Sequence, residues 1–111
     1  MATIYHIATN ADWTARSDTY APTGWRDEGF VHCSTDEQLV RTANRVFPGR
    51  FDLTLLQIDT DMLQALVVWE DTADAGEDFP HIYGPIEVDA VIAATPFAAA
   101  DDGTFDWWSA G

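Results

Sequence analysis

The side chains best suited to chemistry in this 111-residue sequence gather in three short segments. The first contains Tyr5 and His6, the second covers residues 30–35 and the third covers residues 79–84. Each segment carries one of the three histidines, and histidine is the side chain that most readily exchanges protons near neutral pH. A site that combined these segments would suit acid–base chemistry or the binding of a small polar molecule.

The second segment ends where we expect a helix to begin. Ser34 with Glu37, and Thr35 with Gln38, both have the spacing of a capping box, so either residue can be the N-cap. A helix N-terminus offers free amide groups and the positive end of a dipole. Together with His32, this start predicts a place for a phosphate, a carboxylate or a developing oxyanion.

Each histidine also has a purely structural explanation. His6 can be a core histidine bonded to a backbone carbonyl, and His81 can lie in a rigid turn, because residues 79–85 read Phe-Pro-His-Ile-Tyr-Gly-Pro. Cys33 follows His32, which could activate its thiol, although a lone cysteine in a strand is usually buried and inert. The histidines and the cysteine lack the close spacing of a zinc site, and we expect no metal.

Glu70 ends an apolar stretch. Partial burial there would raise the pKa of its carboxyl and suit acid–base work, whereas a carboxylate at a wet rim is the alternative.

The elements that must position these residues follow from the hydrophobic pattern. A helix that starts after Thr35 and ends at Pro48 has an apolar face, and a shorter one around Trp13 is capped by Asn10 or Asp12. A loop covers residues 18–29. Strands are predicted over residues 3–8, 29–33, 51–59, 65–70 and 87–94. Strands with short helices and few crossovers predict an α+β fold in one domain.

The amino-acid composition limits the kinds of molecule that this chain can bind. The chain has 19 acidic residues, 5 arginines and no lysine, for a net charge of −14. This balance disfavours nucleic acid and anionic membranes, and fits either a solubility strategy or a cationic partner. With no signal-like or spanning segment, we expect a cytoplasmic location. Phe105, Trp107 and Trp108 in the tail from residue 96 to 111 should pack on the core or on a partner.

The chain resembles the bacterial family known as domain of unknown function 952. The resemblance covers most of residues 4–95 and excludes the tail. Its matching stretches are residues 4–7, 28–35, 55–59, 69–70 and 79–85.

That family is in turn similar to the ADP-ribosyltransferase-like superfamily, which includes NAD-dependent RNA 2′-phosphotransferases. The similarity lies in a strand-one histidine, His6, and in Val31-His32-Cys33-Ser34 before a helix. It implies a split, mostly antiparallel sheet that binds NAD across its cleft. His6 would hold the nicotinamide ribose, His32 would act beside it, and Glu70 or Glu87 would stabilise positive charge at the sugar.

The same resemblance assigns the remaining contacts to a cofactor or ligand. Tyr5 or Tyr83 would stack on nicotinamide, Ser34 and Thr35 would meet a phosphate, and His81 would lie beside them. The sequence departs from the superfamily where Ile7-Ala8 replaces a small Gly-Thr or Gly-Ser pair. The sequence thus indicates an NAD- or ADP-ribose-handling transferase or hydrolase; the alternatives are a non-catalytic module that binds a small molecule and an acidic protein-interaction domain.

Overall fold

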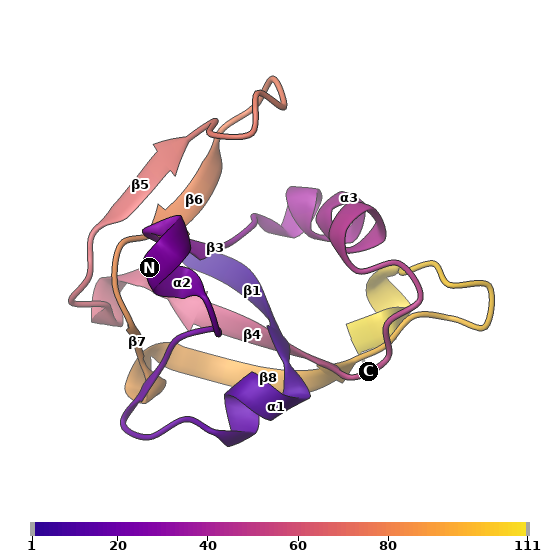
Figure 1. Cartoon of the computed structure of the whole chain (residues 1–111), viewed down its shortest axis with the longest axis horizontal. Coiled ribbons are helices and arrows are strands. Elements are labelled where there is room, and N and C mark those ends of the chain that lie inside the picture. Colours follow the sequence, from indigo (N-terminus) through magenta and orange to yellow (C-terminus); the bar gives the residue numbers. More distant parts are fainter. Residues whose placement is uncertain (1, 111) are drawn as a thin grey trace.

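The computed structural model describes residues 2–110, which form three small antiparallel sheets joined by short helices (Figure 1). The first sheet has the order β1-β4-β8 and the second the order β3-β6-β5. The first sheet consists of β1 (Thr3–Thr9), β4 (Leu53–Asp59) and β8 (Val91–Phe97). The second sheet consists of β3 (Val31–His32), β6 (Phe79–Ile82) and β5 (Val67–Glu70). The third sheet pairs β2 (Thr19–Tyr20) with β7 (Ile86–Glu87). The predicted α+β fold with mostly antiparallel sheets is confirmed.

The first two sheets meet at a single bridge. The backbones of Tyr5 in β1 and Ser34, just after β3, exchange two hydrogen bonds of 2.8 Å. Beyond this point the strands diverge, with β5 and β6 rising away from β1 and β4 in Figure 1. The bridge therefore brings the histidine-bearing strands β1, β3 and β6 into one neighbourhood.

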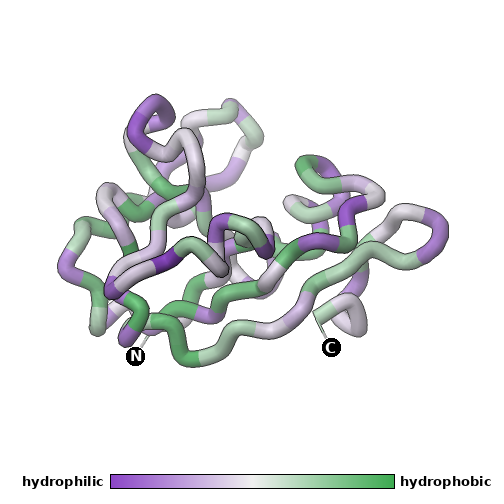
Figure 2. Tube along the Cα trace, turned by 60° about the horizontal axis from the view of Figure 1, so that its bottom comes forward, coloured by the Kyte–Doolittle hydropathy of each residue, from purple (hydrophilic) through white to green (hydrophobic). Residues whose placement is uncertain are grey.

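Two apolar clusters hold the fold together. One lies where the sheets meet, and the other lies between the first sheet and α3 (Asp36–Val46). In Figure 2, apolar residues form runs along the trace, and several of its outer turns are polar. The first cluster includes Ile4, Val31, Leu56, Ile58, Ile82 and Ile86, and the second Leu39, Ala43, Leu53, Phe97 and Phe105.

The helices begin where side chains satisfy their first amides. Thr35 and Gln38 form the complete capping box of α3, which settles the choice between the two predicted caps. For α1 (Asn10–Thr14) the predicted caps are wrong: β1 continues to Thr9, whose hydroxyl accepts the amide of Asp12. The predicted loop over residues 18–29 contains β2 and the short helix α2 (Trp25–Glu28).

One strand was missed in the sequence, and one strand prediction needs correction. Residues 79–82 do not form a rigid turn; they form β6, which pairs with β3 on one side and β5 on the other. Pro80 concealed this strand, because proline is unusual inside a sheet. The strand predicted over 87–94 is broken by a 3₁₀ turn, Val88–Ala90, which separates β7 from β8.

Two more 3₁₀ turns complete the described elements, one at Thr60–Met62 and one at Trp107–Ala110 in the tail. In the tail, the Phe105 ring is buried and stacks on Phe97 at 4.9 Å between ring centroids, as expected, whereas Trp108 is 60% exposed. None of the helices within residues 2–110 has both the length and the apolar character needed to cross a bilayer.

Candidate functional site

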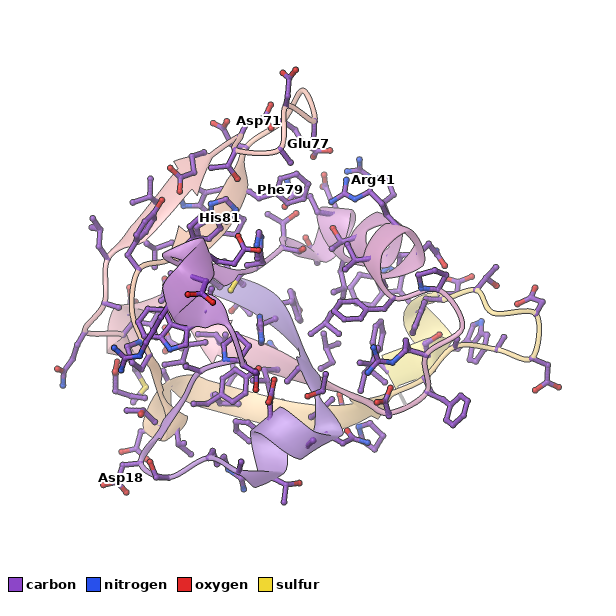
Figure 3. The ribbon with its side chains drawn as sticks, in the orientation of Figure 1. Asp18, Arg41, Asp71, Glu77, Phe79 and His81 are labelled. Carbon is purple, nitrogen blue, oxygen red and sulfur yellow. The ribbon has the colours of Figure 1, made fainter. Side chains whose placement is uncertain are left out.

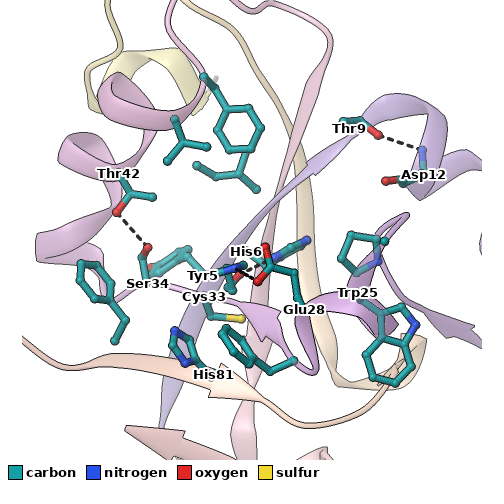
Figure 4. A pocket seen from close by; sticks show the side chains of 18 of the residues that line it. Tyr5, His6, Thr9, Asp12, Trp25, Glu28, Cys33, Ser34, Thr42 and His81 are labelled. Carbon is teal, nitrogen blue, oxygen red and sulfur yellow. Dashed lines mark hydrogen bonds and ion pairs between the residues drawn. The ribbon is translucent and has the colours of Figure 1, made fainter. Parts of the chain in front are cut away.

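A cavity of about 440 Å³ lies where β1, β3 and β6 come together, bounded also by α2 and α3 (Figure 4). His6, His32 and His81 all line it, and so do Tyr5 and Ser34. The tertiary structure thus gathers residues that are far apart in the sequence. Thr35, Glu70 and Tyr83 do not line the cavity.

His6 forms a buried wall of this cavity with both ring nitrogens already bonded. Its Nδ1 lies 2.6 Å from the carbonyl oxygen of His32, and its Nε2 lies 2.8 Å from the hydroxyl of Tyr20. A carbonyl can only accept, so Nδ1 carries the hydrogen and Nε2 accepts from Tyr20. The ring is a connector between β1, β3 and β2, and it has no nitrogen left for a ligand.

Burial fixes the charge of this histidine. Desolvation lowers the pKa of His6 to about 4, and the hydrogen bond to the carbonyl of His32 only partly offsets it. Burial likewise raises the pKa of the Tyr20 hydroxyl, which therefore stays a donor. His6 and Tyr20 are both neutral at physiological pH. His6 is therefore a core histidine bonded to a backbone carbonyl, which is the structural explanation that the sequence allowed for it.

His81 is equally buried, with a side chain only 4% exposed, but its contacts differ. Its Nδ1 lies 2.9 Å from Oε2 of Glu70, and the same oxygen accepts the hydroxyl of Tyr83. These hydrogen bonds, that of Tyr83 first and that of His81 second, lower the pKa of Glu70. The expectation that burial would raise it is wrong, because the carboxyl is partly exposed and well paired.

Aromatic contacts hold the His81 ring in place. Phe30 stacks on it with centroids 4.0 Å apart and planes 15° apart, while His32 approaches edge-on at 5.4 Å. The His32 side chain is 59% exposed, and its Nε2 lies 3.5 Å from a carboxylate oxygen of Glu28. His32 is thus the solvent-exposed histidine of the group, and His81 is a buried one.

The start of α3 is less open to anions than the sequence indicated. The amides of Thr35 and Gln38 are bonded to each other's side chains, and that of Glu37 is bonded to Asp36. Gln38 also donates to Glu77, which pairs with Arg41 (Figure 3). Because these amides are already bonded and the carboxylate of Glu77 lies nearby, the start of α3 disfavours the binding of a phosphate.

Several neighbours of this helix start are also occupied. Ser34 donates its hydroxyl to Thr42 at 3.3 Å, and Cys33 is buried, which raises the pKa of its thiol and makes it inert as a nucleophile. Glu87, the other candidate glutamate, accepts the amide of Gln64 and borders a different hollow. In the part of the chain described, no group of three His, Cys, Asp or Glu side chains is arranged to hold a metal ion.

Charged groups at the cavity are mainly acidic. Asp12 and Glu28 line it, against one arginine, Arg45. Although burial acts to raise it, the pKa of Asp12 is lowered by hydrogen bonds from the hydroxyl and amide of Thr23. Asp12 is therefore a carboxylate at neutral pH, at a wall that also contains aromatic rings.

Sequence reasoning missed Tyr20, Phe30 and Trp25 as cavity residues. Tyr20 follows no recognisable pattern within a predicted loop, and its role depends on β2 pairing with the distant β7. Phe30 carried a usable signal, because it precedes the Val-His segment in an apolar run. Trp25 lies in α2, whose four residues give too short a pattern to detect.

The sequence matches the model of a known protein family. Residues 7–94 match the family described as "Protein of unknown function (DUF952)". The chain belongs to this family. The match agrees with the resemblance seen in the sequence over residues 4–95, and it leaves the tail outside.

Solved structures agree with the fold. The crystal structure of protein CC0527 from Caulobacter crescentus superposes with a TM-score of 0.83 at 30% identity, covering 95% of this chain and 94% of that one. The solution NMR structure of CC0527 gives a TM-score of 0.79 at 30% identity, covering 96% and 93%. No curated protein matches the chain significantly. The similarity to the ADP-ribosyltransferase-like superfamily stays a prediction.

Proposed function

We propose that this chain binds a small organic molecule in the cavity lined by its three histidines. The observation that carries the proposal is the convergence of His6, His32 and His81, from three strands, on one hollow of about 440 Å³. Binding sites for small molecules are concave, mostly apolar, and contain a few polar groups at fixed places, with volumes of roughly 300–1,000 Å³. The cavity meets each of these criteria.

The walls favour a flat, apolar ligand. Tyr5, Trp25, Phe30 and Phe79 all contribute aromatic rings, and such rings pack well against a planar molecule. Two of the polar side chains that line the cavity, those of His6 and Ser34, already have protein partners. We expect recognition to come from ring packing with one or two directional hydrogen bonds.

Charge favours a ligand that is neutral or cationic. Asp12 and Glu28 outnumber Arg45 at the cavity, and the chain carries a net charge of −14. An anionic ligand would have to approach against this field. Nucleic acid, with its phosphate backbone, is disfavoured for the same reason.

NAD and ADP-ribose, which the superfamily resemblance implies, do not fit the residues present. The ring of His6 has no free nitrogen for a ribose hydroxyl, and the amides of Thr35 and Gln38 are not free for a diphosphate. Arg45 is the one arginine among the described lining residues. NAD and ADP-ribose are therefore the alternative ligands in the test below.

The test is a titration of isotope-labelled protein with 2-naphthol, nicotinamide, NAD and ADP-ribose, followed by backbone amide shifts. We expect 2-naphthol to shift amides of the cavity, such as those of His32 and Cys33, with little effect of the two nucleotides. Larger shifts with NAD would favour the ADP-ribose-handling alternative. No shift at the cavity with any probe at millimolar concentration would contradict the proposal.

Two matched variants locate the binding. Ala73 lies in the exposed loop after β5 and lines the cavity, whereas Ala75 is exposed in the same loop and does not. Ala73→Trp should obstruct the cavity and raise the Kd of 2-naphthol roughly tenfold, a difference readily measured. Ala75→Trp adds the same side chain away from the cavity and should leave the Kd unchanged.

A further inference from the structure

His81 has a ring nitrogen with no protein partner, although its side chain is 96% covered by the rest of the chain. Glu70 accepts from Nδ1, and a carboxylate cannot donate, so Nδ1 carries a hydrogen, and in the neutral ring Nε2 keeps its lone pair. Within residues 2–110, no hydrogen bond to Nε2 is formed. His81 therefore presents one unused hydrogen-bond acceptor.

This acceptor opens to the cavity. Among the described residues, no fully buried side-chain nitrogen or oxygen atom lacks a partner, so Nε2 must be reachable from solvent. The ring lines the cavity beside Cys33 (Figure 4), and its face is covered by Phe30. Nε2 is thus the atom through which His81 can meet a ligand.

The position of Nε2 is fixed before any ligand arrives. Tyr83 and Nδ1 of His81 share one oxygen of Glu70, which holds the carboxylate and the ring together. The backbone of His81 pairs with His32 on one side and with Val68 on the other, in the middle strand of its sheet. A rigid acceptor loses little entropy when it binds, which strengthens recognition.

Resting on the proposed function, we propose that the ligand class is small, uncharged aromatic molecules that carry a hydroxyl group, with the O–H donating to Nε2 of His81. The aromatic walls select the ring, Nε2 selects a donor, and the acidic groups Asp12 and Glu28 select against anions. Glu70 and Tyr83 are positioning residues, because they keep Nε2 an acceptor without reaching the cavity themselves.

The other two histidines do not provide this acceptor. Both nitrogens of His6 are bonded, and the ring of His32 is more than half exposed beside Glu28. Water competes for an exposed acceptor, so His32 discriminates weakly between a ligand with a donor and one without.

The experiment compares 2-naphthol with 2-methoxynaphthalene, which keeps the ring system and lacks the donor. The Kd of each is measured by protein amide shifts. We expect the wild-type protein to prefer 2-naphthol roughly tenfold, the size of one well-placed hydrogen bond. His81→Phe keeps an aromatic ring and removes the acceptor, so the preference should disappear, whereas His32→Phe should retain it.

A second measurement does not depend on a variant. The ¹⁵N shifts of the His81 ring in the wild-type protein should show a hydrogen on Nδ1 and a lone pair on Nε2. Addition of 2-naphthol should move the Nε2 signal, and 2-methoxynaphthalene should not. A hydrogen found on Nε2 instead would overturn the inference even if His81→Phe failed to fold.

The positioning role has its own readout. Glu70→Leu has a similar side-chain length and removes the oxygen that accepts from Nδ1, so the hydrogen is no longer held on Nδ1. The fraction of His81 rings with the hydrogen on Nε2 should rise, and the preference for 2-naphthol should fall. Glu77→Leu removes a carboxylate that contacts Gln38 and Arg41 and should leave the tautomer and the preference unaltered. An unchanged tautomer in Glu70→Leu would contradict the positioning role.

The outcomes separate the two proposals. If neither naphthalene binds the cavity, this inference fails, and the proposed function fails with it when nicotinamide, NAD and ADP-ribose also give no shift at the cavity. If both bind equally well, or if the preference survives in His81→Phe, this inference is overturned while small-molecule binding stands.

Discussion

His6 and His81 line the same cavity from strands of two different sheets, and both are buried, yet only His81 has a ring nitrogen without a protein partner. His6 gives Nδ1 to a backbone carbonyl and Nε2 to Tyr20. His81 gives Nδ1 to Glu70, and its Nε2 has no protein partner and is not fully buried. The comparison teaches that burial alone does not decide whether a histidine can bind a ligand, because the number of ring nitrogens already bonded differs between two equally buried rings.

A tyrosine makes the difference on each side. The hydroxyl of Tyr20 bonds to the ring of His6 itself and completes it. The hydroxyl of Tyr83 bonds instead to the carboxylate that orients His81. A tyrosine therefore occupies the second ring nitrogen of His6, whereas a tyrosine orients His81 only through Glu70. We expect mutations around His6 and around His81 to have different effects.

The largest effect should follow from His6→Ala. The change leaves the Tyr20 hydroxyl and the His32 carbonyl without their partner in a buried place, and it opens a cavity. We expect the free energy of unfolding to fall by about 3 kcal/mol, as measured by urea denaturation. A loss below about 1 kcal/mol would mean that His6 is not a structural connector.

The pH dependence of stability should carry the signature of the same residue. The folded pKa of His6 is about 4 and the ordinary value is 6.5, so between these pH values the unfolded chain binds more protons than the folded one. Stability should therefore decrease as the pH falls from 6.5 to 4, by roughly 3 kcal/mol in total, and this contribution should be constant above that window.

The control for this pH dependence is His6→Gln, which lacks the titrating group. The difference in unfolding free energy between wild type and His6→Gln isolates the histidine from carboxylates that titrate nearby, such as Asp12. If that difference did not change between pH 6.5 and 4, the lowered pKa of His6 would be contradicted.

The smallest effect sharpens the comparison between the tyrosines. Tyr20 is 1% exposed, and Tyr20→Phe should lower the unfolding free energy by about 1–2 kcal/mol, because Nε2 of His6 loses its donor. Tyr83 is 41% exposed, and Tyr83→Phe should cost less, while it raises the pKa of Glu70 toward its ordinary value. Thermal denaturation and a carboxyl NMR titration measure the two quantities. Equal losses of stability in Tyr20→Phe and Tyr83→Phe would contradict the difference between the surroundings of His6 and those of His81.

Local patterns predicted much of the scaffold. The helix Asp36–Val46 followed from its capping residues and apolar face, and β1 and β4 from their composition. β6 escaped because its pairing on both sides is a long-range property that Pro80 seemed to oppose. The structure brings the three histidines that the sequence singled out to one cavity, but the sequence could not tell which ring nitrogens were occupied, since most of their partners are distant along the chain.

The sequence by itself determined the α+β class, the acidic charge, the family resemblance and the identity of the three histidines, because these depend on composition and short-range spacing. Only the tertiary structure decided that Tyr20 reaches His6 and that Glu70 reaches His81. The physical reason is that hydrogen bonds act over about 3 Å, and sheet pairing decides which distant side chains come within that distance.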